Sequence, residues 1–352
     1  MVTAAPIRIV YFGTPEFAVP TLTTLIQASD VEVVGVVSQP DRPKGRGHRV
    51  AATPTKTLAT LCGIPVLQPT KLRDEGFLAA LGALHPDLGV VAAYGRILPD
   101  PLLRLPPLGM INVHGSLLPK YRGAAPVHRA VIAGDTETGV TIMRVVQELD
   151  AGAMLAKVST AIGPDDTSLE IERTLARLGA SLLLDVVRGM MRGEIVEMPQ
   201  DDAQATYAPK VEKAESPIDW SLPAGRIHNQ VRGLQPWPLA STTIAGMRCL
   251  IHRTGVGARP GSGIRGPGSE DSRLEDQGSE DQRIEDPGLA DQGSRISDAG
   301  LVMSDEGFLS VLAGDGQILR VLQIQPEGRR TMTAREFLSG RRIEPGTRLG
   351  PS

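Results

Sequence analysis

The densest group of polar residues lies between positions 110 and 126, where the chain reads M-I-N-V-H-G-S-L-L-P-K-Y-R-G-A-A-P. Apolar and polar residues alternate from 111 to 114, which predicts a strand end with Asn112 and His114 on one face. In open α/β sheets, ligands bind beyond the carboxyl ends of the strands. An imidazole that exchanges protons near neutral pH, beside an amide donor, would be useful there for acid–base chemistry.

A second polar segment, E-L-D-A-G at 148–152, places Asp150 in a Gly-containing loop after an expected strand at Val140–Val146. Two arrangements fit this pattern. Either Asp150 meets His114, or Asp150 is an ordinary loop residue and His114 is satisfied by backbone groups. The second arrangement is the commoner one for any isolated pair, because functional groups are a minority of titratable residues.

The elements that must position these residues alternate between strand and helix signals. Expected strands are Ile7–Phe12, Val31–Ser38, Pro65–Leu67, Leu88–Ala92 and Met110–His114. Expected helices are Glu16–Ser29, one starting at Thr53-Pro54 with Thr as N-cap, Phe77–Leu84 and Ser168–Arg192. The alternation predicts an α/β fold with a Rossmann-like, doubly wound parallel sheet over residues 1–192.

A polar connector at 193–206 precedes a second region of short β-prone runs, residues 207–345. This pattern predicts a small all-β domain, most simply a barrel. An acidic insert at about 257–299 interrupts it, with a ten-residue repeat at 268–287 that carries eight acids and two arginines, a net charge of −6. With few large apolar residues, the insert cannot bury enough surface to offset chain entropy, so we expect it to be disordered.

Composition excludes several classes of protein. The chain has 352 residues, 3% of them aromatic, so base-stacking capacity is small. Two cysteines, and six histidines without ligand spacing, argue against a disulfide framework and predict no metal. No apolar run approaches the ~20 residues of a membrane span, which excludes a membrane-spanning helix. With only two cysteines, a reducing cytoplasm is the simplest location, and we expect a monomer. The turn Gly13-Thr14-Pro15 lacks the G-x-G-x-x-G pattern of dinucleotide-binding oxidoreductases.

The segment D-R-P-K-G-R-G-H-R at 41–49 carries four formal positive charges and one negative charge. Its Gly and Pro residues predict an exposed loop. A solvated basic loop is the commoner explanation of such a run. The alternative is a phosphate-binding loop with salt-dependent affinity.

The run N-V-H-G-S-L-L-P-K-Y-R-G-A-A-P, followed by L-D-A-G, resembles the formyltransferase family that uses 10-formyltetrahydrofolate. The match extends to the members that act on methionine carried by initiator tRNA. Its further segments are F-G-T-P-E-F (12–17), S-Q-P-D-R-P-K-G-R-G (38–47), V-A-A-Y-G (91–95), G-D-T-E-T-G-V-T-I-M (134–143), A-T-Y-A-P-K (205–210), I-D-W (218–220) and P-W-P (236–238). The resemblance covers about 5–250 and, more weakly, 300–340. Ala153 departs from the Asp that the family often has.

The resemblance implies transfer of a formyl group from 10-formyltetrahydrofolate to the α-amino group of methionine on initiator tRNA. Asn112 and protonated His114 would stabilise the oxyanion that forms. His114 would move the proton from the attacking amine to the folate nitrogen, and Asp150 would orient the imidazole ring. The resemblance also implies folate contacts for four adjacent residues, Ser116, Leu117, Leu118 and Pro119.

The same resemblance places Arg42, Lys44 and Arg46 against the acceptor end of the tRNA, and it makes the second domain an OB-like tRNA-binding module. A folate-dependent formyltransferase acting on an amino sugar or other small amine is the alternative. Such an enzyme would share the 112–150 site but would not need the basic loop. A tRNA-binding protein without activity fits less well, because Asn112, His114 and Asp150 are all present. A formyl-folate hydrolase is a further option that no residue requires.

Overall fold

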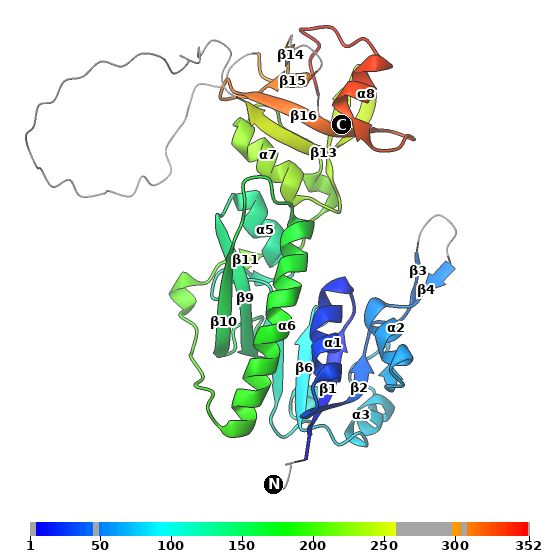
Figure 1. Ribbon diagram of the computed structural model, residues 1–352, viewed down its shortest axis with the longest axis vertical. Helices are drawn as coiled ribbons and strands as arrows, with labels where there is room; N and C mark the ends of the chain where they lie inside the picture. Colours follow the sequence, from blue (N-terminus) through cyan, green and yellow to red (C-terminus); the bar gives the residue numbers. More distant parts are fainter. Residues whose placement is uncertain (1–4, 45–48, 258–297, 304–307, 351–352) are drawn as a thin grey trace, which may run out of the picture. The chain divides into compact units, whose positions relative to one another are not determined.

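The computed structural model describes residues 5–44, 49–257, 298–303 and 308–350. The chain divides into two compact units, which are described separately (Figure 1). The first consists of Met1–Glu215 and Arg232–Pro238, and the second of Ser216–Val231 and Leu239–Ser352. The acidic insert expected at about 257–299 lies outside the described residues except at its two ends.

A seven-stranded sheet forms the centre of the first unit, with the order β10-β9-β7-β6-β1-β2-β5. The strands are β1 (Ile7–Gly13), β2 (Val31–Val37), β5 (Val66–Leu67), β6 (Leu88–Ala92), β7 (Met110–His114), β9 (Glu137–Arg144) and β10 (Met154–Ala161). The pairs from β5 to β7 are parallel, which confirms the predicted α/β fold. β9 runs antiparallel to β7, and β10 runs antiparallel to β9, so the sheet is mixed at this edge.

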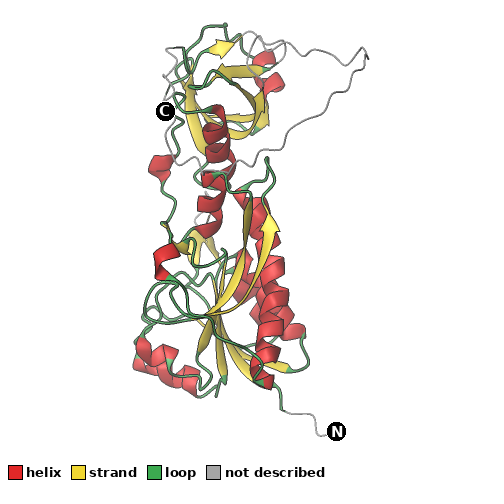
Figure 2. Ribbon diagram, turned by 90° about the vertical axis from the view of Figure 1, so that its left-hand side faces the viewer, coloured by secondary structure: helices red, strands yellow, loops and turns green. Residues whose placement is uncertain are grey.

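Helices cover both faces of this sheet (Figure 2). They are η1 (Glu16–Ala18), α1 (Val19–Gln27), α2 (Pro54–Leu61), α3 (Glu75–Gly82), α4 (Asp100–Leu103), α5 (Pro126–Ala133) and α6 (Ser168–Arg192). Successive residues of β1 point to opposite faces. Ile9 therefore joins the core with α1 and α6, whereas Val10 joins the core with α3 and α4. Burial on both faces explains the nearly continuous apolar runs of the central strands.

Local signals set the ends of two predicted helices. Helix α6 begins after Thr167 in a capping box with Glu170, and it ends at Gly193, which has a φ of 68°. Helix α2 begins with Pro54 after Thr53, whose side chain accepts a hydrogen bond from the backbone N–H of Lys56. The expected N-cap and the bounds of Ser168–Arg192 are confirmed.

Two short strand pairs lie outside the main sheet. Strands β3 (Arg42–Lys44) and β4 (Arg49–Ala51) form an antiparallel hairpin within the segment expected as a basic loop (Figure 1). Strand β8 (Arg122–Gly123) pairs in parallel with β11 (Tyr207–Ala208), which follows the expected connector. The connector at 193–206 therefore leads straight back to the loop after β7.

The second unit is built on an antiparallel sheet with the order β12-β13-β16-β15-β14, and a further strand, β17, pairs with β16. Its strands are β12 (Ala240–Ile244), β13 (Met247–Gly257), β14 (Val302–Met303), β15 (Leu309–Leu312), β16 (Ile318–Pro326) and β17 (Met332–Thr333). The prediction of a small β domain is confirmed by this sheet, which is antiparallel throughout its described strand pairs. It missed helices α7 (Ala224–Gly233) and α8 (Ala334–Ser339). A capping box of Thr333 and Glu336 begins α8, a signal that the sequence does contain.

Candidate active site

Asn112 and His114 lie at the carboxyl end of β7, and both line one cavity of about 540 Å³. Asp150, from the loop between β9 and β10, lines the same cavity. His114 Nδ1 lies 3.7 Å from Asp150 Oδ2, and the two side chains are 5% and 15% exposed. The structure thus brings the three residues singled out in the sequence to one cavity, with Asp150 beside His114.

The orientation of the His114 ring is set by a backbone carbonyl. His114 Nε2 lies 2.9 Å from the carbonyl oxygen of Tyr121. Because a carbonyl oxygen can only accept, Nε2 is the donor, and Nδ1 is the nitrogen that faces Asp150. In the neutral ring Nδ1 then carries no proton, so it is the nitrogen that can accept one, with the Asp150 carboxylate beside it. The arrangement suits a histidine that takes and returns a proton at Nδ1.

Asp150 is held in a backbone conformation that few non-glycine residues adopt, with a φ of 49°. Its Oδ2 accepts a hydrogen bond of 2.8 Å from the N–H of Gly123. Gly152 lets the loop close on β9, since a Cβ there would lie 1.9 Å from the carbonyl oxygen of Arg144. The sequence L-D-A-G therefore needs its glycine for close backbone approach.

Gln200, in the connector after α6, clamps the same loop. Its Nε2 donates to the carbonyl oxygens of Asp150 and Gly152, each at 2.8 Å. Its Oε1 accepts a hydrogen bond of 2.9 Å from Arg122 Nε, and Arg122 Nη2 pairs with Asp202 at 2.7 Å. Arg122 is 4% exposed. Sequence reasoning missed both residues, although Arg122 belongs to the run K-Y-R-G that was quoted for the resemblance.

Two further groups of side chains line the cavity, and neither was given a role from the sequence. The first comes from the segments after β6 and β9: Tyr94, Gly95, Arg96, Ile97, Leu98, Val145, Val146, Gln147, Glu148 and Leu149. The second includes Phe17, Val127, His128 and Glu172. Burial raises the pKa of Glu172, opposed by Arg173, and burial lowers the pKa of His128 with help from Arg129. The surroundings of Glu172 and His128 therefore favour the uncharged form of each side chain.

The four residues expected to contact folate do not line the cavity that contains His114. None of Ser116, Leu117, Leu118 and Pro119 is among the residues that line the 540 Å³ cavity. Ser116 Oγ donates to the carbonyl oxygen of Lys120 at 2.6 Å, and Leu118 is buried among Met143 and Met154. Leu117 lines a second cavity of about 400 Å³ together with Tyr121. These residues shape the loop that carries the Tyr121 carbonyl to His114.

The basic residues expected to meet tRNA occupy the β3–β4 hairpin. Arg42 begins β3 and is exposed, and it forms no ion pair with any residue that the structure describes. Lys44 ends the same strand, and Arg46 lies outside the described residues. Within the described ranges, no helix is long and apolar enough to cross a membrane, and no cluster of three or more His, Cys, Asp or Glu side chains could hold a metal ion.

Comparison with known proteins places both parts of the chain in one family. Residues 7–187 match the formyl transferase family model, and residues 210–342 match the model for the formyl transferase C-terminal domain. The methionyl-tRNA formyltransferase of Heliobacterium modesticaldum is 44% identical over 356 residues, covering 97% of this chain and 100% of that protein. That of Methylococcus capsulatus is 42% identical over 348 residues, covering 97% of this chain and 99% of that protein.

Solved structures share the fold at much lower identity. The sugar 3N-formyl transferase WlaRD aligns with a TM-score of 0.60 at 15% identity, over 93% of this chain and 100% of that one. An N-formyltransferase from Helicobacter canadensis aligns with a TM-score of 0.60 at 14% identity, over 90% of this chain and 98% of that one. The sugar enzymes therefore share architecture, whereas the full-length relatives above 40% identity act on methionyl-tRNA by name. Over nearly its whole length, this chain therefore belongs to the methionyl-tRNA formyltransferase family.

Proposed function

We propose that this chain transfers the formyl group of 10-formyltetrahydrofolate to the α-amino group of methionine esterified to initiator tRNA, and so supports translation initiation. The observation that carries the proposal is the meeting of Asn112, His114 and Asp150 in one cavity. Methionyl-tRNA formyltransferases match this chain along nearly its whole length, which supports the same acceptor. No covalent acyl-enzyme is required, because the amine attacks the formyl carbon directly.

The reaction needs one bond to form, one to break and one proton to move. The neutral amine attacks the formyl carbon, which creates a carbon–nitrogen bond, an oxyanion and an ammonium group. The Asn112 amide N–H donates to the oxyanion as it forms, and His114, neutral at that point, becomes a second donor once its Nδ1 has taken the ammonium proton. His114 Nδ1 accepts the ammonium proton and delivers it to the folate nitrogen as the old carbon–nitrogen bond breaks. Asp150, 3.7 Å away, stabilises the cationic ring between these two steps.

Folate fits the cavity by size and by lining. About 540 Å³ lies within the range of small-molecule sites, and apolar side chains such as Leu98 and Val145 line it beside polar groups. The buried hydroxyl of Tyr94 has no hydrogen-bond partner among the described residues, and Tyr94 lines the same cavity. A flat, polar-edged pterin ring suits such a wall. We therefore place folate in this cavity, with Ser116, Leu117, Leu118 and Pro119 as the loop that backs His114.

The tRNA acceptor end is assigned to the basic hairpin and to the second domain. Arg42, Lys44 and Arg46 would neutralise phosphates, which makes affinity fall with salt. Initiator selection would rest on how easily the terminal base pair opens, by analogy with the indirect readout of deformable DNA. The proposed division is a formyltransferase domain at 1–192, a linker at 193–206 and an OB-like tRNA-binding domain at 207–345. We propose that the enzyme works as a monomer in the bacterial cytoplasm.

The experiment that tests the proposal is a formylation assay with 10-formyltetrahydrofolate. Methionyl initiator tRNA is compared with methionyl elongator tRNA as the acceptor. Strong transfer to the initiator alone would support the reaction, the acceptor and the selectivity together. Bound folate without transfer to either tRNA would overturn the acceptor, and a panel of amino sugars would then test the small-amine alternative.

A further inference from the structure

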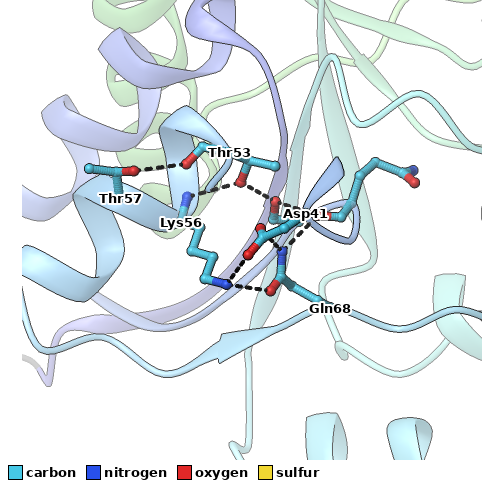
Figure 3. Close-up of polar contacts among 7 residues, drawn as sticks. Asp41, Thr53, Lys56, Thr57 and Gln68 are labelled. Atoms are coloured by element: carbon cyan, nitrogen blue, oxygen red, sulfur yellow. Dashed lines mark hydrogen bonds and ion pairs between the residues drawn. The ribbon is translucent and has the colours of Figure 1, made fainter. Parts of the chain in front are cut away.

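Three polar side chains interlock at the base of the β3–β4 hairpin, and we name them the hairpin anchor: Asp41, Lys56 and Gln68 (Figure 3). Lys56 Nζ lies 2.5 Å from Asp41 Oδ2 and donates to Gln68 Oε1 at 2.8 Å. Gln68 Nε2 closes the ring by donating to Asp41 Oδ1 at 2.7 Å, and it also donates to the carbonyl oxygen of Gln39 at 2.8 Å. Each side chain of the anchor bonds the other two.

The anchor ties the base of the hairpin to helix α2 and to the end of strand β5. Asp41 directly precedes β3, Lys56 lies in the first turn of α2, and Gln68 directly follows β5. The start of α2 is itself fixed, because Thr53 accepts from the Lys56 N–H and its hydroxyl bonds Ser38 Oγ (Figure 3). Residue 41 is thus held by contacts that are remote in sequence, and Arg42 is the next residue along the chain.

The charges of the anchor are engaged with each other. Asp41 and Lys56 are 21% and 29% exposed. The hydrogen bond from Lys56, followed by that from Gln68, holds the pKa of Asp41 below its usual range, so the carboxyl is ionised at neutral pH. A carboxylate beside a phosphate-binding loop would weaken binding by repulsion alone. Since Asp41 adds no attraction for phosphate, its bonds to Lys56 and Gln68 point to a role in holding the base of the hairpin.

We propose that Asp41, Lys56 and Gln68 are positioning residues, which fix the base of the β3–β4 hairpin so that Arg42 meets the tRNA backbone. The inference rests on the proposed role of the hairpin in tRNA binding. It assigns no contact with tRNA to the anchor itself. Its value to the enzyme is that Arg42 is ordered before tRNA arrives, so less entropy is lost on binding.

Asp41→Ala distinguishes a positioning role from a purely electrostatic one, because the two predict opposite changes in the KM for tRNA. Removal of a negative charge near a phosphate site lowers the KM for tRNA if only charge matters. If the anchor positions Arg42, the KM for methionyl initiator tRNA instead rises roughly tenfold. The KM for 10-formyltetrahydrofolate and the kcat at saturating tRNA stay unchanged. Asp41→Asn, which keeps one of the two oxygen acceptors, gives a smaller rise.

Glu32→Ala is the matched control, because it removes the same charge from an exposed ion pair with Arg8 in the same unit. We expect no change in the KM for tRNA from this substitution. Thermal unfolding of each variant checks that the fold is intact. Lys56→Met, which keeps the aliphatic stem, is the second variant should Asp41→Ala fold poorly, and it is expected to raise the KM for tRNA to a similar extent.

Combination with Arg42→Ala tests the route of the effect. If the anchor acts through Arg42, then Lys56→Met adds nothing to the KM for tRNA in the Arg42→Ala background. Additive effects would mean that Lys56 meets tRNA itself and would overturn the inference. A raised KM in Arg42→Ala with an unchanged or lowered KM in Asp41→Ala would also overturn it, while leaving the hairpin in its proposed function. An Arg42→Ala variant with normal KM would refute the hairpin's role and the inference together.

Discussion

Gln200→Ala is the substitution that tests how the Asp150 loop is held. The wild-type side chain donates two hydrogen bonds of 2.8 Å, to the carbonyl oxygens of Asp150 and Gly152. It also accepts one from Arg122. Asp150 has a φ of 49°, so its backbone depends on neighbours that keep it there. Without Gln200, the loop can relax and move the carboxylate away from His114.

The expected loss follows from the number of bonds removed. A hydrogen bond contributes about 0.5–1.5 kcal/mol net, so the two loop bonds together contribute about 2 kcal/mol. If all of this holds the loop in its productive position, the ratio of relaxed to productive loop rises by a factor of roughly 30. We therefore expect kcat to fall about 10- to 30-fold. That is less than the loss expected on removing His114, since the carboxylate is displaced and not deleted.

The assay is steady-state formylation of methionyl initiator tRNA, with each substrate varied in turn. We expect the KM for tRNA to stay near the wild-type value, because Gln200 is remote in sequence from the basic hairpin and bonds the Asp150 loop. Gln204→Ala is the control, since Gln204 is also in the connector but, among the described residues, its side chain bonds only Asp201. A kcat for Gln200→Ala equal to that of the control, in a protein with unchanged Tm, would refute the reasoning.

Three other outcomes follow from the site. His114→Ala and Asn112→Ala should each lower kcat by roughly 10² or more, and undiminished single-turnover transfer would contradict their roles. Gly152→Ala should lower both Tm and kcat, because the added Cβ meets the Arg144 carbonyl. We expect the free energy of unfolding to fall by about 1–3 kcal/mol, and an unchanged Tm in calorimetry would contradict this. Glu172→Gln should raise Tm at neutral pH, because burial raises the pKa of this carboxyl in the folded state and its charged form is destabilising. That gain should shrink as the pH falls to about 4, where the unfolded chain also protonates, and a gain independent of pH would count against it.

Much of the fold was predictable because its signals are local. The bounds of β7 and α6 were predicted to the residue, the first from apolar–polar alternation and the second from a long amphipathic run of apolar residues. The direction of β9 was not predictable in this way. It depends on how α5 returns the chain to the sheet, and no local pattern of residues reports strand direction.

The sequence predicted which residues would meet at the candidate site, but not which residues hold them in place. Asn112, His114 and Asp150 were found from residue type and from a long resemblance. Gln200 lies in a polar connector and has no distinctive local pattern. Its role depends on hydrogen bonds to carbonyl groups 50 and 48 positions earlier, which a local pattern does not reveal. The wall formed by 94–98 and 145–149 was missed for a similar reason, since a cavity is a property of several segments at once.

The pairing of β8 with β11 has a consequence for how the protein is made. The N–H of Tyr121 donates to the Thr206 hydroxyl across 85 residues of sequence, and the N–H of Arg122 donates to the carbonyl oxygen of Thr206. Residues 206–208 are synthesised after every strand of the sheet and after α6. On a ribosome, the sheet and α6 can therefore form before residues 200–208 emerge, while the loop around His114 still lacks its partners. The emerging enzyme gains its fold first and its catalytic geometry second, when the strand after the connector arrives.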